Sequence, residues 1–589
     1  MNTRPAGRRR MLASAALAGV LLGGCATDGG APRPATVEVK LIAFNDLHGN
    51  LDPPGIAIRA PLPGGGSVPV PAGGAAYLAS AIASLEARNP RHAVISAGDL
   101  IGASPLVSAL FLDEPTIEAV NAMHIDFNAV GNHELDKGPQ ELLRMQNGGC
   151  ARFTARQPCR LGEGFAGANF RFLAANTLQA DGSTLFPGSA IKTFKDGNAT
   201  VRIGFIGLTL RGTASLVTPS RVAGLRFADE AHSANALVPQ LKAQGADAIV
   251  VVLHQGGFTE GGDPVSGCQG LSGPVLPILD RLDPAIEAVI SGHTHRSYVC
   301  DYTTPSGHRI LLTSAGQYGT LLTDIDLGFD PVSHRLASKS AVNRIVQGEA
   351  FGSVALAGQF PKFDRDSRIA ALIERYRALA GPLTKREVGR LAAPVTRQQS
   401  ASRESALGEL IADAQLAATR APASGGAQIA FMNPGGMRAD LVPGPDGSVD
   451  YGQLFGIQPF GNTLVVKTMT GAQIRALLEQ QFASGSNTLA TPRVLLPSQG
   501  FSYAFDLRAA PGARISGMRL DGRPVVDEAR YRVTMNDFLA AGGDNFSVFE
   551  QGTDPLGGGQ DVDALEAYIA AKGPAAVPVT GRILNLAAP

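Results

Sequence analysis

Seven side chains that suit metal coordination follow closely after apolar runs of the chain. They are Asp46, His48, Asp99, Asn132, His254, His293 and His295. Carboxylate, imidazole and amide groups together suit borderline divalent ions such as zinc, manganese, iron or cobalt. Because seven ligands exceed the needs of one tetrahedral ion, the set predicts two ions that share a carboxylate. Such a pair attracts phosphate and can hold the attacking and leaving oxygens of a phosphoryl displacement.

These ligands are expected to meet because of where the preceding runs would end. The runs are "VEVKLIAF", "HAVISA", "IDFNAV", "ADAIVVVL" and "IEAVIS", and they alternate with helix-like stretches. Apolar, β-branched runs of this kind predict buried strands of an α/β domain. Ligands of open α/β sheets bind just beyond the carboxyl ends of strands. Five strand ends that carry His, Asp or Asn therefore predict one shared site.

Taken singly, each histidine is explained as well by a surface or capping role as by metal binding. The whole set at five strand ends favours the metal site. Five other histidines lie outside any such strand end and are predicted to be core or surface residues: His92, His124, His232, His308 and His334.

Length and charge narrow the class of protein. A chain of 589 residues that is 44% hydrophobic predicts two or more packed domains. Its formal net charge is zero, so no polyanion-binding surface is indicated and polymeric nucleic acid is not an expected partner.

Five motifs in this order resemble a known domain. "FNDLHGN", "GDLIG", "GNHELD", "VLHQGG" and "GHTH" resemble the calcineurin-like metallophosphatase domain and, more closely, the bacterial and animal 5′-nucleotidase family. The resemblance implies that Asp46, His48 and His295 bind one metal ion. It implies that Asn132, His254 and His293 bind the second ion, and that Asp99 bridges the two.

The resemblance also assigns the residues next to Asn132. His133 corresponds to the catalytic histidine that faces the scissile phosphate, and Asp136 to the carboxylate that orients and charges its imidazole. Such an imidazolium can stabilise or protonate the leaving oxygen, while metal-activated water attacks phosphorus. Glu134 has no predicted chemical role, and a structural carboxylate is the favoured interpretation.

Residues 384–589 resemble the C-terminal, nucleoside-holding domain of the 5′-nucleotidases. The motifs are "RESALGELIADAQL", "QIAFMNPGGMR", "LFGIQPFGN" and "NDFLAAGGDNF". By this resemblance Phe460 and Phe538 sandwich the base, and Asp544 accepts hydrogen bonds from the ribose hydroxyls. By the same resemblance, Arg403, Asn433 and Arg438 would contact the phosphate or the edges of the base. Arg397 is a further, less strongly indicated contact of this kind. Two departures from the family pattern are Pro434, which removes an amide donor, and Glu409.

The chain begins with an export signal. Arg8–Arg10 precede an apolar run, Met11–Leu22, that is too short to cross a membrane. "LGGC" resembles a bacterial lipobox, which implies removal of residues 1–24 and a lipid on Cys25. Ala26 then implies sorting to the outer membrane, facing the periplasm, and residues 25–36 predict a flexible tether. The alternatives are a plain secretory signal with an incidental cysteine, or, for the export route, a twin-arginine signal.

The other cysteines are Cys150, Cys159, Cys268 and Cys300. An even count in an exported chain predicts two disulfides, although four cysteines permit three pairings. Proximity in sequence favours Cys150 with Cys159 and Cys268 with Cys300. A zinc site is less favoured, because no Cys-x-x-Cys pair is present.

The expected architecture is α/β throughout. The resemblance implies a four-layer αββα metallophosphatase sandwich over 37–345 and an α/β nucleotide-binding domain over 384–589. The segment 346–383 would be a linker with an interdomain helix, which Gly381–Pro382 should end.

Three functions compete. The first is an exported dimetal phosphohydrolase that acts on nucleoside monophosphates, and on UDP-sugars or cyclic nucleotides as further substrates. The second is a sulfur-oxyanion hydrolase of the same fold, which the set of Phe460, Phe538 and Asp544 disfavours. The third is a catalytically silent nucleotide-binding lipoprotein, which the pair of His133 and Asp136 disfavours. Metal identity, base preference and oligomeric state stay open.

Overall fold

The computed structural model describes residues 36–154, 156–162, 164–218, 221–260 and 265–587. Cys25, the signal peptide and the tether up to residue 35 lie outside the described residues.

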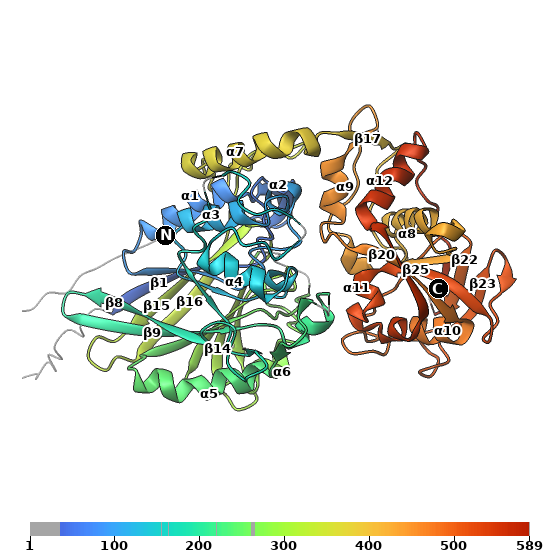
Figure 1. Ribbon diagram of the computed structural model, residues 1–589. Coiled ribbons are helices and arrows are strands. Elements are labelled where there is room, and N and C mark those ends of the chain that lie inside the picture. Colours follow the sequence, from blue (N-terminus) through green and yellow to red (C-terminus); the bar gives the residue numbers. More distant parts are fainter. Residues whose placement is uncertain (1–35, 155, 163, 219–220, 261–264, 588–589) are drawn as a thin grey trace, which may run out of the picture. The chain divides into compact units, whose positions relative to one another are not determined.

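Two six-stranded sheets form the N-terminal domain (Figure 1). The first has the order β16-β15-β1-β4-β5-β6, and its last four strands run parallel. Its strands are β1 (Val37–Phe44), β4 (His92–Ser96), β5 (Phe127–Ala129), β6 (Arg171–Leu173), β15 (Leu321–Phe329) and β16 (Leu336–Ile345). The second has the order β13-β14-β12-β11-β9-β8, with β9, β11, β12 and β14 parallel. Its strands are β8 (Ser189–Asp196), β9 (Ala199–Leu208), β11 (Ala248–Leu253), β12 (Ile286–Ser291), β13 (Ser297–Thr303) and β14 (Arg309–Ala315).

Alternate residues of β1 show how the sheets are layered. Leu41 and Ala43 belong to a core cluster shared with β9, β11 and β12 of the other sheet. Ile42 and Phe44 point to the opposite face and pack against helices. These helices include α1 (Ala75–Glu86), α3 (Glu114–Ala122), α4 (Pro139–Asn147) and α7 (Ser367–Thr384). The second sheet is covered by α5 (Glu230–Ala243) and α6 (Leu276–Leu279), so the predicted αββα order is confirmed.

The helix predicted in the linker is longer than expected. Asp366 caps α7 by accepting the backbone N–H groups of Arg368 and Ile369, as a good N-cap does. Gly381–Pro382 does not end it, because α7 continues to Thr384. Pro382 lies inside the last turn, where it has no N–H to donate to the carbonyl of Ala378. The Thr384 hydroxyl donates to the carbonyl of Ala380 at 2.9 Å.

The C-terminal domain contains a five-stranded sheet, β21-β18-β25-β20-β26, and a four-stranded sheet, β24-β23-β22-β27. The first consists of β18 (Ile429–Met432), β20 (Thr463–Thr470), β21 (Leu496–Pro497), β25 (Arg530–Asn536) and β26 (Thr553–Gln560). The second consists of β22 (Phe501–Phe505), β23 (Ile515–Leu520), β24 (Arg523–Pro524) and β27 (Ile583–Asn585). The helices are α8 (Ala406–Thr419), α9 (Tyr451–Ile457), α10 (Gly471–Glu479), α11 (Asp537–Ala540) and α12 (Asp561–Ala571).

Local capping explains two of these helices. Ser405, in the "RESALGELIADAQL" motif, accepts the backbone N–H of Gly408 and so begins α8, as an N-cap serine does. The residues "LFGI" of the "LFGIQPFGN" motif belong to α9. Asp450 and Gln453 form a capping box that nucleates α9, and Asp450 lies upstream of that stretch.

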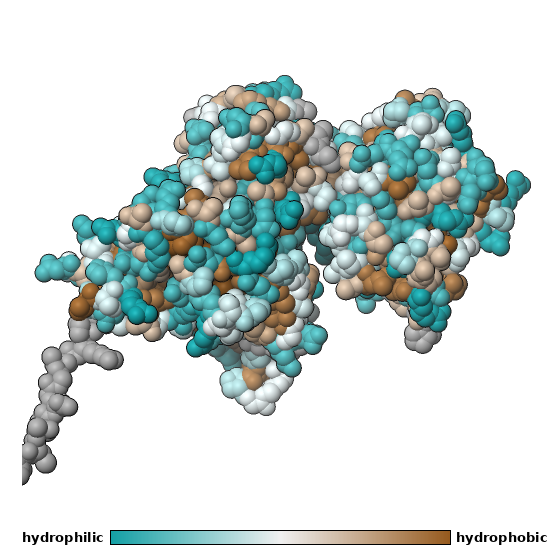
Figure 2. Space-filling view, turned by 90° about the horizontal axis from the view of Figure 1, so that it is seen from below, coloured by the Kyte–Doolittle hydropathy of each residue, from teal (hydrophilic) through white to brown (hydrophobic). Residues whose placement is uncertain are grey.

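Both predicted disulfides are present. Cys150 is bonded to Cys159 and Cys268 to Cys300. Polar and apolar side chains are interspersed on the face drawn in Figure 2, as is ordinary for a protein surface. Among the described residues, no helix combines the length and apolar character needed to cross a membrane.

Candidate active site

The seven predicted ligands converge at the carboxyl ends of five strands from both sheets. Asp46 and His48 follow β1, Asp99 follows β4, and Asn132 follows β5. His254 follows β11, and His293 and His295 follow β12. His254 Nε2 lies 3.0 Å from Asp99 Oδ2 and 3.1 Å from Asn132 Oδ1. His293 Nδ1 lies 3.0 Å from Asn132 Oδ1. His48 Nε2 lies 3.6 Å from Asp99 Oδ2, so Asp99 contacts ligands of both groups.

The hydrogen bonds of His48 and His254 orient their ring nitrogens in a way that suits cation binding. The Nδ1 atoms of His48 and His254 face the backbone carbonyls of Gly102 and Ala97, at 2.9 and 2.8 Å. A carbonyl only accepts, so each Nδ1 donates and each neutral ring presents the Nε2 lone pair to the cluster. His48 Nε2 is 3.1 Å from His295 Nε2. Two nitrogen lone pairs at that distance need a proton or a cation between them.

The backbone at the ligands adopts uncommon conformations. Positive φ angles occur at five of the seven ligands: Asp46, His48, Asp99, His293 and His295. Such angles are rare outside glycine and cluster at functional sites, where the surrounding structure enforces them. Two glycines allow the close approach. A Cβ on Gly98 would lie 2.6 Å from His254 Nδ1, and one on Gly131 would lie 2.2 Å from Asp99 Oδ1.

Glu134 has the structural role that the sequence favoured. Its Oε2 accepts the backbone N–H groups of Asp99 and Gly131 at 2.9 and 2.7 Å, and its Oε1 accepts that of Leu100 at 2.8 Å. Burial, reinforced by the nearby Asp99 carboxylate, raises the pKa of Glu134 to about 8. One side chain thus joins the two loops that follow β4 and β5.

Burial and neighbouring charges shift the pKa values of two histidines of the cluster in opposite directions. Burial disfavours the charged form of His254, yet the Asp99 carboxylate outweighs it and raises the pKa of His254 to about 10. Burial and then the charge on His254 lower the pKa of His293 to about 3. Without metal, a proton on His254 compensates Asp99. A divalent ion would displace that proton, as metal binding commonly does.

His133 pairs with Asp136 and also lies close to His48 and Asp99, with which it could offer ligand atoms to an ion. Its Nδ1 lies 2.9 Å from Asp136 Oδ2 and 3.1 Å from Oδ1. Burial disfavours the imidazolium, but the carboxylates of Asp136 and Asp99 outweigh it and raise the pKa of His133. Because a carboxylate accepts, Nδ1 carries a hydrogen and Nε2 is the atom that can exchange a proton.

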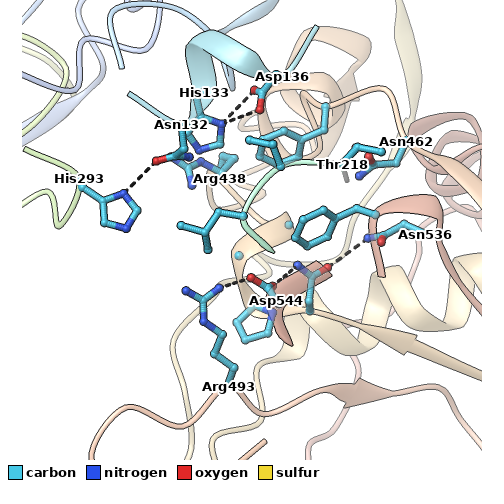
Figure 3. A pocket seen from close by; sticks show the side chains of 18 of the residues that line it. Asn132, His133, Asp136, Thr218, His293, Arg438, Asn462, Arg493, Asn536 and Asp544 are labelled. Atoms are coloured by element: carbon cyan, nitrogen blue, oxygen red, sulfur yellow. Dashed lines mark hydrogen bonds and ion pairs between the residues drawn. The ribbon is translucent and has the colours of Figure 1, made fainter. Parts of the chain in front are cut away.

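One cavity of about 390 Å³ is lined by both domains (Figure 3). From the N-terminal domain its predicted residues are Asp99, Asn132, His133, Asp136, His293 and His295. From the C-terminal domain they are Asn433, Arg438, Phe460, Phe538 and Asp544. Asp46, His48 and His254 are fully buried and are not among the lining residues.

One aromatic and one cationic side chain of the cavity, Phe460 and Arg438, lie close to His133. The Phe460 ring stacks on the His133 imidazole with 5.8 Å between centroids and 21° between planes. The Arg438 guanidinium lies over the Phe460 ring, 6.0 Å from its centroid. Phe538 is half-buried and packs close to Gly543, where a Cβ would lie 2.6 Å from the Phe538 ring.

Two predicted arginines do not reach the cavity. Arg403 is half-buried, has a left-handed φ of 62°, and does not line the cavity. Arg397 pairs with Asp440 instead, at 3.2 Å. Glu409 lies elsewhere in the domain, 3.4 Å from the Arg582 Nε. The lining residues that sequence reasoning did not assign include Gln399, Asn462, Arg493 and Asn536. Of these, Asn462 was within reach, because it ends the "PFGN" motif.

Family comparisons cover both parts of the site. Residues 39–297 match the model of the calcineurin-like phosphoesterases, and residues 384–551 match that of the 5′-nucleotidase C-terminal domain. The first match contains all seven predicted ligands, and the second contains Phe460, Phe538 and Asp544.

Three individual proteins that resemble this chain show the extent of the similarity. It is 28% identical to the endonuclease YhcR of Bacillus subtilis over 90% of this chain, but spans only 40% of that protein's length. A 5′-nucleotidase precursor from Thermus thermophilus has a TM-score of 0.73 and 25% identity, with 94% of this chain and all of that chain covered. The sulfate thiohydrolase SoxB of Thermus thermophilus has a TM-score of 0.65 at 18% identity, with 93% and 96% covered, which shows the shared fold alone.

Proposed function

The chain belongs to the 5′-nucleotidase family of metal-dependent phosphoric monoester hydrolases, and we propose that it releases phosphate from nucleoside 5′-monophosphates. One observation carries the proposal. A single cavity is lined by metal-ligating residues, by His133, and by the aromatic and carboxylate side chains suited to a nucleoside. UDP-sugars and cyclic nucleotides are further candidate substrates.

Metal ions would be held by the ligand cluster. Asp46, His48 and His295 form one group of possible ligand atoms, and Asp99, His254 and His293 form another. Asn132 adds an amide oxygen to the second group. Divalent ions bound there supply Lewis acidity toward phosphate and activate water. Zinc, manganese, iron and cobalt all suit this mixture of nitrogen and oxygen ligands.

His133 is proposed as the proton donor to the leaving oxygen. Asp136 holds its Nδ1 hydrogen, which leaves the Nε2 proton free for transfer. The raised pKa of His133 favours the positively charged ring, which would also stabilise negative charge on the phosphate. Arg438 adds a second positive charge to the same cavity.

The C-terminal residues would hold the nucleoside. Aromatic stacking between Phe460 and Phe538 suits a flat heterocycle of any identity. Phe460 already stacks on the His133 imidazole through one face, which places the proposed base-binding ring beside the proposed proton donor. Asp544 is 2% exposed and lines the cavity, where its carboxylate would accept hydrogen bonds from ribose hydroxyls.

A panel of substrates tests the proposal. Phosphate release is measured on nucleoside 5′-monophosphates, UDP-glucose, 2′,3′-cyclic AMP and an aryl phosphate, with each metal and after dialysis against chelator. We expect the highest kcat/KM on a mononucleotide, and loss of activity with the metal. Hydrolysis of sulfur oxyanion esters in preference to nucleotides would favour the sulfur-substrate alternative. Nucleotide binding without turnover in every metal would favour the silent binding protein.

Export and lipid attachment are a separate part of the proposal. The support is the sequence alone, "LGGC" after an apolar run of twelve residues from Met11 to Leu22. Radiolabelled fatty acid should enter the protein in a bacterial host, and Cys25→Ser should abolish the label and release the protein from membranes. Labelling that persists in Cys25→Ser would exclude this site of attachment.

A further inference from the structure

The cavity carries a second C-terminal arginine that the proposed function does not use. Arg493 lies between α10 and β21 and lines the cavity together with Asn433 and Asp544. No motif in the sequence singles it out. Arg403, which the sequence assigned to phosphate or base edges, does not line the cavity.

Arg493 contacts the carboxylate proposed to bind ribose (Figure 3). Its Nη1 donates to Asp544 Oδ1, and Asn433 Nδ2 donates to Asp544 Oδ2 at 2.7 Å. Asn433 is held in turn by Asn536, whose Nδ2 donates to Asn433 Oδ1 at 3.1 Å. Both oxygens of Asp544 are therefore fixed in orientation. Each oxygen keeps a lone pair that a substrate hydroxyl can use.

The position of Asp544 makes this support necessary. The residue is 2% exposed and has a left-handed φ of 54°. Asn487 Nδ2 donates to its backbone carbonyl at 2.7 Å, which holds the turn in place. A buried carboxylate without a cation is costly. Arg493 supplies the charge, and the contact uses only one of its five N–H donors.

We propose that Arg493 is a specificity-determining residue that selects substrates with a vicinal ribose diol. It does so by holding the Asp544 carboxylate in one orientation, so that one hydroxyl donates to each oxygen. This inference rests on the proposed function. A substrate that lacks both hydroxyls leaves the buried pair of Arg493 and Asp544 without its partners, and sites of this type reject such analogues strongly.

The chain offers a matched control. Arg475 also forms an ion pair with an aspartate of the C-terminal domain, Asp527, at 2.9 Å. Its side chain is 34% exposed, against 30% for Arg493. It does not line the cavity. Its partner Asp527 is 47% exposed, against 3% for Asp544, so the control matches the arginine and not the burial of the aspartate. Arg475→Met therefore removes an arginine–aspartate pair of the same domain without touching the proposed ribose site.

Steady-state kinetics on the metal-loaded full chain test the inference with AMP and 2′,3′-dideoxy-AMP as probes. We expect Arg493→Met to lower the preference for AMP, as the ratio of kcat/KM values, by about tenfold or more. The loss should appear mainly in KM for AMP. Arg493→Lys should restore part of the preference, and Arg475→Met should keep the wild-type ratio. Calorimetric binding of adenosine against 2′,3′-dideoxyadenosine gives the same comparison without turnover.

Each outcome is decisive. An unchanged ratio in Arg493→Met, or an equal loss on both substrates, would overturn the specificity role while the proposed function stands. A wild-type protein that hydrolyses no mononucleotide would instead overturn the proposed function. If Arg493→Met fails to fold, Arg493→Lys decides. A wild-type ratio of kcat/KM values for AMP and 2′,3′-dideoxy-AMP in Arg493→Lys would show that the guanidinium group is not required, because lysine carries its charge on a single ammonium group.

Discussion

The metal-ligand cluster and the nucleoside-facing residues differ in how firmly the fold holds them. Asp46, His48 and His254 are fully buried at strand ends, and each side chain is hydrogen-bonded to a backbone group. Phe460 and Phe538 are half-buried, and Phe460 stacks on His133. The fold therefore encloses the proposed metal ligands more completely than the proposed base-stacking residues. Rigidity suits metal binding and transition-state electrostatics, whereas stacking of different bases tolerates adjustment.

The largest effect should come from the shared carboxylate. Asp99→Ala removes the oxygen that lies 3.0 Å from His254 Nε2 and the acceptor of the His133 backbone N–H at 2.9 Å. We expect phosphate release to fall to background and the metal content, measured by mass spectrometry, to fall with it. Asp326→Ala is the control, because Asp326 is 51% exposed on β15 and pairs with Lys40. Substantial activity in Asp99→Ala with both ions retained would contradict the bridging role.

His133 should separate catalysis from metal binding. His133→Asn removes the proposed proton donor but no ligand of the seven. We predict that kcat falls by about 10²–10⁴, while metal content stays at the wild-type value. The loss should be smaller on an aryl phosphate with a good leaving group, which needs less protonation. A parallel drop in metal occupancy would identify His133 as a ligand instead.

Substitution of the two phenylalanines should have different effects on an aryl phosphate. Stacking on a base is worth about 1–3 kcal/mol, so Phe538→Ala should lower kcat/KM on AMP by about 5- to 150-fold. Phe460→Ala should show a comparable loss on AMP and, because its ring covers His133, a measurable change on an aryl phosphate too. Wild-type kcat/KM on AMP in the double variant would reject the stacking assignment and favour the sulfur-substrate alternative.

The smallest effect concerns a buried carboxyl behind the Phe460 loop. Asp561 Oδ2 accepts from Gln458 Nε2 at 3.2 Å, and its backbone N–H donates to the carbonyl of Asn462 at 3.0 Å. Burial raises the pKa of Asp561 to about 8, against 3.8 in an exposed state. The folded state therefore binds a proton that the unfolded state has lost, and stability should fall as pH rises from about 4 to 8.

Asp561→Asn should remove that part of the pH dependence. We expect its Tm to exceed that of the wild type at pH 8 and the difference to shrink toward pH 4. The corresponding difference in the free energy of unfolding should change by at most about 1.4 kcal/mol for each step of one in pH. An amide can replace the protonated acid here, because Gln458 Oε1 is buried without a partner among the described residues and can accept from it after an amide flip. A Tm difference that is constant from pH 4 to 8 would contradict this.

The reaction centre was largely predictable from sequence because its geometry follows from sheet topology. Parallel strands deliver the residues after their carboxyl ends to one edge, so "FNDLHGN", "GNHELD" and "GHTH" point to one site wherever they lie in the chain. The adjacent glycines were equally informative, since Gly98 and Gly131 stand where a side chain would collide with ligands. The same locality made the Ser405 cap and the nearby cysteine pairs predictable.

Tertiary structure alone decided which arginine side chains line the part of the cavity proposed to bind the nucleoside. Arg403 lies in a motif but does not line the cavity, whereas Arg493 lies in no motif and contacts Asp544 across a separation of 51 residues. Likewise the role of Glu134 became visible only when the loops after β4 and β5 came together around it. The physical reason is that strand ends place residues by local periodicity, while loops are placed by packing and charge pairing between distant segments, which the sequence does not encode locally.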